Sequence, residues 1–165
     1  MKAPHSILLF LLLEGTVLSE TTPPLRILLI EDNQDHARIF KWALQQSGQP
    51  NQLTVFQSGE AGFEYLKSLA HQVDVAPDLV FIDLNLPKVD GREILQRIKT
   101  DESTKGYPVI MLSSSEREED VVAAYRLGAS SFISKTVLLE DLGPVLESIQ
   151  RYWTKIARLP GRKQA

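Results

Sequence analysis

Five short, mostly apolar runs alternate along the chain with segments of helical periodicity, and this alternation constrains the fold more than any other feature. The runs cover residues 26–30, 53–56, 79–82, 109–112 and 131–134. Those at 26–30, 79–82 and 109–112 show no polar alternation, as expected of strands that are buried on both faces. The sequence therefore predicts an α/β domain, with a five-stranded parallel sheet and helices on both of its faces.

Apolar residues recur at three- and four-residue steps between these runs, which is typical of amphipathic helices. The predicted helices cover residues 35–47, 59–70, 92–100 and 115–127, and one long helix follows residue 134. The segment 115–118 matches a capping box, which would begin the fourth helix. Pro144 is expected in the first turn of the main part of the last helix, which would run to Leu159. That part would be about 24 Å long and extend beyond a small sheet.

Charged and small polar residues follow four of the predicted strands, at the points where the strands end. They are Glu31 and Asp32 after the first strand, Asp83 and Asn85 after the third, Ser113 after the fourth and Lys135 after the fifth. Each has an ordinary explanation when taken alone, such as capping of the next helix or contact with solvent. Because parallel sheets bind ligands outside the carboxyl ends of their strands, we expect these side chains to meet at one rim.

Three carboxylates at one rim repel each other, and a hard divalent cation such as Mg2+ would stabilise them. Such a site suits an incoming dianionic phosphoryl group. Asp83 would be the nucleophile, and Lys135 would form an ion pair with the phosphate. The hydroxyl of Ser113 could donate a hydrogen bond to a phosphoryl oxygen once the group has arrived. The residue types thus predict Mg2+-dependent acceptance of phosphate.

The same residues resemble a known family. The motifs are Ile-Glu-Asp-Asn at 30–33, Asp-Leu-Asn-Leu-Pro-x-x-Asp-Gly at 83–91, Ser113 and Lys135. Together they are similar to the receiver domain of two-component response regulators. The resemblance covers about 25–159, and it implies the (βα)5 flavodoxin-like receiver fold with an extended C-terminal helix.

The resemblance also implies a role for each residue of the rim. The phosphoacceptor would be Asp83, the metal ligands of Mg2+ would be Glu31, Asp32, Asp83 and the backbone carbonyl of Asn85, and the catalytic and switch residues would be Ser113, Lys135 and Phe132. A histidine kinase would donate the phosphoryl group. The segments 83–87, 91–93, 152–153 and 158–160 resemble those of single-domain response regulators paired with cyanobacterial phytochrome histidine kinases. A phytochrome-type kinase is therefore a candidate donor.

One position departs from the family pattern. The family usually carries a proline directly after the lysine, in a cis peptide, whereas this chain has Thr136. A cis bond before another residue type costs about 2.5–4 kcal/mol. The bond between Lys135 and Thr136 is therefore expected to be strained or trans, and both the placement of the lysine and the lifetime of the phosphate stay open on the sequence alone.

Two other functions fit parts of the pattern. A receiver-like module could act without phosphorylation as a docking or dimerisation platform, but this interpretation predicts a missing acid or nucleophile, and none is missing. A Mg2+-dependent phosphatase of the haloacid-dehalogenase type would use a second aspartate two residues after the nucleophile, where this chain has Asn85. We therefore expect a signalling protein that relays its state through protein–protein contacts, and no turnover enzyme.

The ends of the chain are expected to lie outside the receiver domain. We predict an N-terminal extension and linker at 1–24, the receiver domain at 25–159 and a basic tail at 160–165. Residues 7–13 are apolar and follow a basic start, in the manner of a signal peptide, although an upstream extension or a packing arm is preferred. A cytoplasmic location is expected, because the phosphate donor is cytoplasmic.

Composition and charge limit the remaining partners. The chain has no cysteine, which excludes disulfides, zinc–thiolate sites and cysteine nucleophiles. A net charge of −3 gives no general case for nucleic acid, and the run at 7–13 is too short to span a membrane. The segment 148–165 carries five basic residues and no acid, so a basic end adjoins an acidic body. The C-terminal helix could pack only on its own body, lie on a membrane surface or form a homodimer contact. We expect a homodimer formed through the C-terminal helix region.

Overall fold

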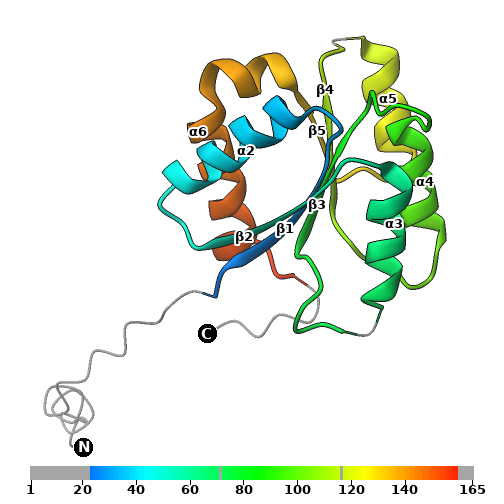
Figure 1. Cartoon of the computed structure of the whole chain (residues 1–165), viewed down its shortest axis with the longest axis horizontal. Helices are drawn as coiled ribbons and strands as arrows, with labels where there is room; N and C mark the ends of the chain where they lie inside the picture. Colours follow the sequence, from blue (N-terminus) through cyan, green and yellow to red (C-terminus); the bar gives the residue numbers. More distant parts are fainter. Residues whose placement is uncertain (1–22, 71, 116, 160–165) are drawn as a thin grey trace, which may run out of the picture.

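The computed structural model describes residues 23–70, 72–115 and 117–159, with the backbone alone at 137–140 (Figure 1). The predicted signal-peptide-like segment and the basic tail at 160–165 lie outside the described residues. Within the described part, five parallel strands form one sheet in the order β2-β1-β3-β4-β5. The strands are β1 (Leu25–Ile30), β2 (Asn51–Phe56), β3 (Leu79–Asp83), β4 (Val109–Ser113) and β5 (Ser131–Ser134). The predicted α/β fold with a parallel sheet is confirmed.

Helices cover both faces of the sheet. They are α2 (Gln34–Gln46), α3 (Gly59–Ser68), α4 (Gly91–Thr100), α5 (Glu118–Arg126) and α6 (Lys135–Arg151), and a π-helical turn, η1 (Tyr152–Ile156), continues α6. Figure 1 shows α2 and α6 on one side of the sheet and α3, α4 and α5 on the other. The molecule is therefore a three-layer α/β/α sandwich. Because the helices cover the faces of the sheet, side chains at the ends of the strands can form a site.

Each face of the sheet has its own hydrophobic core, because successive side chains of a strand point to opposite faces. In β1, Ile27 and Leu29 pack with α2 and α6, whereas Leu28 and Ile30 pack with the three helices of the other side. Every residue of β3 and of β4 is buried. This double burial explains why both strands are continuous apolar runs up to their last residue, which is polar and ends the strand.

The fourth helix begins differently from the prediction. The capping box expected at 115–118 is wrong: α5 begins at Glu118 after Arg117, and no side chain caps it. The hydroxyl of Ser115 instead donates to the carboxylate of Asp120 at 2.7 Å, so it is already engaged with another partner.

The C-terminal helix is bent, and it does not project from the body as a straight rod. It begins at Lys135, directly after β5, and the backbone at Asp141 is non-helical (φ −136°, ψ 38°). Pro144 lies in the first turn after this kink, as predicted. After η1 the chain becomes extended at Ala157 and returns to the body, where Leu159 is buried in the α2/α6 core. The predicted overhanging helix up to Leu159 is therefore wrong.

Candidate functional site

Three carboxylates converge at the carboxyl ends of β1 and β3. Glu31 and Asp83 are buried and Asp32 is half-buried, and one oxygen from each of the three lies within 4.8 Å of the others. The pairing of β1 with β3 brings Ile30 level with Ile82, so the acids that follow these two residues meet at the same rim. The clustering expected from the strand order is thus present in the folded chain.

Local hydrogen bonds orient the acidic residues. Asn33 is the N-cap of α2, and its side-chain oxygen accepts from the backbone N–H groups of Asp35 and His36. The N–H of Asn33 points to Glu31 Oε1 at 3.3 Å. This arrangement explains the sequence Glu-Asp-Asn after β1, because the same turn caps the helix and supports the first acid.

Asp83 is the last residue of β3, and the loop that follows closes tightly over it. The backbone N–H of Asn85 donates to Asp83 Oδ1 at 3.1 Å. A Cβ atom at Gly91 would lie 2.2 Å from the backbone oxygen of Asp83, and the N–H of Gly91 donates to Leu84 O at 2.9 Å. Glycine is required at 91 because this close approach leaves no room for a side chain.

Lys135 enters the site from the first position of α6. Its ammonium nitrogen lies 2.6 Å from Glu31 Oε2 and 2.8 Å from Asp83 Oδ2, and the side chain is almost wholly buried. The peptide bond to Thr136 is trans. The side-chain oxygen of Ser134 accepts from the N–H of Thr136 at 3.2 Å, so this serine is the N-cap of α6. A capped helix start, in place of proline, therefore brings the lysine to the two acids.

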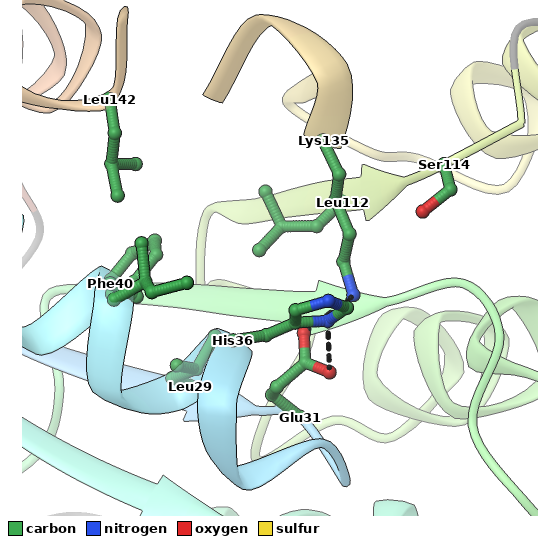
Figure 2. A pocket seen from close by; sticks show the side chains of 9 residues that line it. Leu29, Glu31, His36, Phe40, Leu112, Ser114, Lys135 and Leu142 are labelled. Atoms are coloured by element: carbon green, nitrogen blue, oxygen red, sulfur yellow. Dashed lines mark hydrogen bonds and ion pairs between the residues drawn. The ribbon is translucent and has the colours of Figure 1, made fainter. Parts of the chain in front are cut away.

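His36 is a fourth polar side chain at the site, and the sequence did not single it out. Its Nδ1 lies 3.3 Å from both Glu31 Oε1 and Lys135 Nζ. Figure 2 shows the imidazole beside the carboxyl group of Glu31, with the tip of Lys135 directed toward both. These three residues form the polar end of a small cavity of about 50 Å³, whose other walls include Phe40 and Leu142. The position of His36, in the first turn of the helix after Glu31, is the only sequence signal for this role.

The electrostatics of the site follow from burial and close charges. Burial raises the pKa of Glu31 above its ordinary value, and the nearby carboxylate of Asp83 acts in the same direction. The hydrogen bond and the positive charge of Lys135 act against this rise. A cation beside Glu31 therefore stabilises its charged form against the effect of burial.

The predicted switch residues lie on neighbouring strands. Ser113 ends β4, is fully buried, and its Oγ accepts from the N–H of Ser115 at 2.9 Å. Phe132 is half-buried in β5, level with Met111 of β4, and packs against the core of the α3/α4/α5 side. Ser113 therefore lies on the strand next to β3, whose last residue is the predicted phosphoacceptor. Phe132 lies one strand further along the sheet.

A network of charged and polar side chains joins the loop after β4 to the start of α4. Ser115 donates to Asp120 at 2.7 Å, and Asp120 accepts from Arg92 Nη1 at 3.0 Å. Arg92 also forms an ion pair with Asp90, the N-cap of α4, at 2.6 Å. The network links the starts of α4 and α5, and the sequence did not predict it.

The donor set fits a hard divalent cation. Glu31, Asp32 and Asp83 offer carboxylate oxygens only, which are the ligands that Mg2+ prefers, usually together with water. The backbone carbonyl of Asn85 as a further ligand stays a prediction. The cavity beside His36 is far smaller than the pockets that hold organic cofactors, so it does not compete with this interpretation.

Comparison with known proteins agrees with this geometry. The model of the response regulator receiver domain matches residues 27–147, and the chain therefore belongs to this family of signalling proteins. It is 34% identical to the response regulator Rcp1 of a Synechocystis species, over 86% of this chain and 97% of Rcp1. It is 36% identical to the probable methanogenesis regulatory protein FilR2 of Methanothrix harundinacea, over 89% and 94% of the two chains.

Solved structures give the same result. The phosphorylated cyanobacterial phytochrome response regulator RcpA superposes with a TM-score of 0.73 at 36% identity, covering 83% of this chain and 99% of RcpA. The Mn2+-bound form of Rcp1 superposes with a TM-score of 0.71 at 34% identity, covering 83% and 99%. The predicted resemblance to the regulators of cyanobacterial phytochromes is confirmed. Across the described ranges, no helix is both long and apolar enough to cross a membrane.

Proposed function

We propose that this protein is a single-domain response regulator that accepts a phosphoryl group on Asp83 in a Mg2+-dependent reaction. The observation that carries the proposal is the meeting of Glu31, Asp32 and Asp83, with the ammonium of Lys135 2.8 Å from Asp83. Glu31, Asp32, Asp83 and the carbonyl of Asn85 would hold the metal ion. When bound, Mg2+ supplies positive charge to the acids and to the phosphoryl oxygens. A bound Mn2+ in the related Rcp1 supports this part.

The donor is a histidine kinase, with a phytochrome-type kinase as the candidate, and the reaction is a simple transfer. A carboxylate oxygen of Asp83 attacks the phosphorus of a phosphohistidine. The new P–O bond forms as the P–N bond breaks, and the electron pair leaves with the imidazole nitrogen. Lys135 neutralises charge on the phosphoryl oxygens. The relationship to phytochrome response regulators supports this donor class. A cytoplasmic location is part of the proposal, because such a donor acts in the cytoplasm.

The switch follows from the position of Ser113. Its hydroxyl turns toward the new phosphoryl oxygen and leaves space that Phe132, on the adjacent strand, fills. The complete burial of Ser113 and the half-buried position of Phe132 support this motion. The phosphate then favours one of two packings of the β4 and β5 region, and partner proteins detect the changed surface.

Phosphate incorporation tests the assignment of Asp83. The protein is incubated with Mg2+ and acetyl phosphate, and the mass of the intact chain reports the added phosphoryl group. Asp83→Asn is expected to abolish incorporation. Asp35→Asn, at an exposed carboxylate on α2, is the matched control and should incorporate phosphate as the unaltered protein does. Equal incorporation in Asp83→Asn would refute the assignment.

Metal binding is tested separately, without a phosphodonor. Calorimetric titration should show binding of one Mg2+, and Asp32→Asn should weaken it by about 10-fold or more, since it removes one charged ligand. Unchanged affinity in Asp32→Asn would remove this residue from the site.

The C-terminal region is the proposed homodimer contact. Tyr152 and Ile156 are 48% and 68% exposed, and Arg151 and Arg158 are exposed basic residues of the same segment. Trp153 contributes less than expected from the sequence, because it is half-buried against the α2/α6 core. Light scattering of the full chain is expected to give a dimer, and Ile156→Glu is expected to give a monomer. A monomeric unaltered protein, with and without acetyl phosphate, would exclude this contact.

A further inference from the structure

The ammonium group of Lys135 has three protons and three polar neighbours within 3.3 Å. Two are carboxylate oxygens, Glu31 Oε2 at 2.6 Å and Asp83 Oδ2 at 2.8 Å. The third is Nδ1 of His36, at 3.3 Å. No other polar side chain among the described residues lines the cavity beside this group except Ser114. His36 Nδ1 lies within hydrogen-bonding distance of the ammonium group and can therefore take its third proton when it carries none itself.

The same nitrogen of His36 also lies 3.3 Å from Glu31 Oε1, and the two contacts exclude each other. An ammonium group only donates and an ionised carboxylate only accepts. If Nδ1 carries no proton, it accepts from Lys135. If Nδ1 carries the proton, it donates to Glu31 and directs an N–H toward the ammonium, which is unfavourable. The carboxylate of Glu31 already accepts hydrogen bonds from the ammonium of Lys135 and from the N–H of Asn33, so it does not need a further donor.

We propose that His36 is a positioning residue, whose unprotonated Nδ1 accepts the third proton of Lys135 and keeps the ammonium directed at Asp83. The inference rests on the proposed phosphoacceptor function of Asp83. It also gives a physical reason why the lysine keeps its position in a chain with Thr136 in place of proline: a flexible side chain is fixed at its tip as well as at its Cα. His36 itself is held by the N-cap of α2, through its N–H and Asn33 Oδ1 at 3.1 Å.

This role is most important when Glu31 is engaged with a metal ion. Glu31 then has less negative charge to offer to the ammonium, and repulsion from the cation opposes the position of Lys135. An uncharged acceptor such as the imidazole still holds the ammonium without competing for the metal. His36 thus acts on the reaction only through Lys135.

The tautomer of His36 is a direct test. Long-range 1H–15N NMR of the full chain reports which ring nitrogen of His36 carries a proton. The expected result is an unprotonated Nδ1 and a protonated Nε2. In Lys135→Met the acceptor role is lost, and the ring is expected to change to the Nδ1–H tautomer that donates to Glu31. A protonated Nδ1 in the unaltered protein would overturn the proposal.

A pair of variants tests the consequence for phosphorylation. His36→Leu removes the acceptor and should lower the rate of phosphate incorporation from acetyl phosphate by roughly 10-fold, the usual size for loss of an orienting partner. His36→Asn keeps a side-chain oxygen near the position of Nδ1 and should restore most of the rate. In the Lys135→Met background, His36→Leu should have no further effect, because the residue acts through the lysine. An undiminished loss in that background would contradict the proposal.

Affinity for Mg2+ separates this role from damage to the pocket. His36→Leu should change the calorimetric Kd for Mg2+ by less than about twofold, since His36 is not a ligand. A loss of Mg2+ affinity parallel to the loss of rate would show that His36 acts through Glu31 instead of Lys135. The two proposals also fail separately. A protein with the expected tautomer that takes up no phosphate refutes the function of Asp83. Phosphorylation at Asp83 with a full rate in His36→Leu refutes only the role of His36.

Discussion

At the start of α6, the side-chain oxygen of Ser134 accepts a hydrogen bond from the backbone N–H of Thr136 at 3.2 Å. Proline at position 136 would have no N–H to donate, so this cap is specific to a chain that carries another residue there. The cap fixes the first turn of the helix, and Lys135 is its first residue. The geometry of a capped helix start therefore determines where the side chain of Lys135 enters the acidic site.

Removal of this cap should affect stability and phosphorylation together. Ser134→Ala is expected to lower the free energy of unfolding by about 1 kcal/mol, which is typical for a lost N-cap. It should also slow phosphate incorporation from acetyl phosphate, because the first turn that carries Lys135 is less firmly held. Ser130→Ala, at an exposed serine before β5, is the control. Denaturant titration and intact mass measure the two effects, and a full rate in Ser134→Ala would show that the cap does not position the lysine.

The ion pair between Arg92 and Asp120 should contribute measurably to stability. Asp120 is mostly buried, with 12% of its side chain exposed, and it also accepts from Ser115. A double-mutant cycle of Arg92→Met and Asp120→Asn is expected to give a coupling energy of about 0.5–1 kcal/mol, near the upper range for pairs close to the surface.

A second pair on the same molecule is the control for that cycle. Arg38 and Asp35 are 3.3 Å apart with 76% and 82% of their side chains exposed, so a cycle of Arg38→Met and Asp35→Asn should give a coupling energy near zero. Equal coupling in the two cycles would mean that burial of Asp120 does not strengthen its ion pair.

The sheet and the acidic rim could be predicted because their signals are local and strong. Buried parallel strands are nearly continuous apolar runs, so the short runs at 79–82 and 109–112 indicate strands. The first charged residue after such a strand lies at the rim by necessity, which is why the amino-acid sequence alone is enough to place Glu31 and Asp83 there.

Other features depend on contacts between distant segments, and the sequence carries no local signal for them. His36 resembles any half-exposed helix residue until α6 brings Lys135 beside it. The pattern at 115–118 matches a capping box, but Ser115 is engaged by Asp120 of the next turn. The kink at Asp141 and the burial of Leu159 arise because the C-terminal segment packs against α2 and the sheet, which helical periodicity alone does not reveal.

Arg92 also determines how Asp90 titrates. Hydrogen bonds from the Arg92 side chain hold the pKa of Asp90 below its ordinary value of 3.8. The unfolded chain then binds more protons than the folded one between the two pKa values, so stability rises with pH in this window. The contribution is complete above the ordinary value and is lost as the pH falls through the folded pKa. NMR titration of Arg92→Gln should show the pKa of Asp90 moving up toward 3.8, whereas Arg38→Gln should leave it unchanged.

Gln150 is a buried polar residue in α6, with 1% of its surface exposed. Neither its amide nitrogen nor its amide oxygen has a hydrogen-bond partner within the described part of the chain. A buried polar group without a partner costs about 1–3 kcal/mol, so Gln150→Met, which has a similar volume and no amide, should raise the free energy of unfolding by that order.

The matched variant for Gln150 is Gln150→Glu, which places a charge at the same buried position and should destabilise the protein by more than the amide does. Urea titration of both variants and of the unaltered chain measures whether the free energy of unfolding rises in Gln150→Met and falls in Gln150→Glu. If Gln150→Met proves less stable than the unaltered protein, the amide takes part in an interaction that stabilises α6 against the sheet.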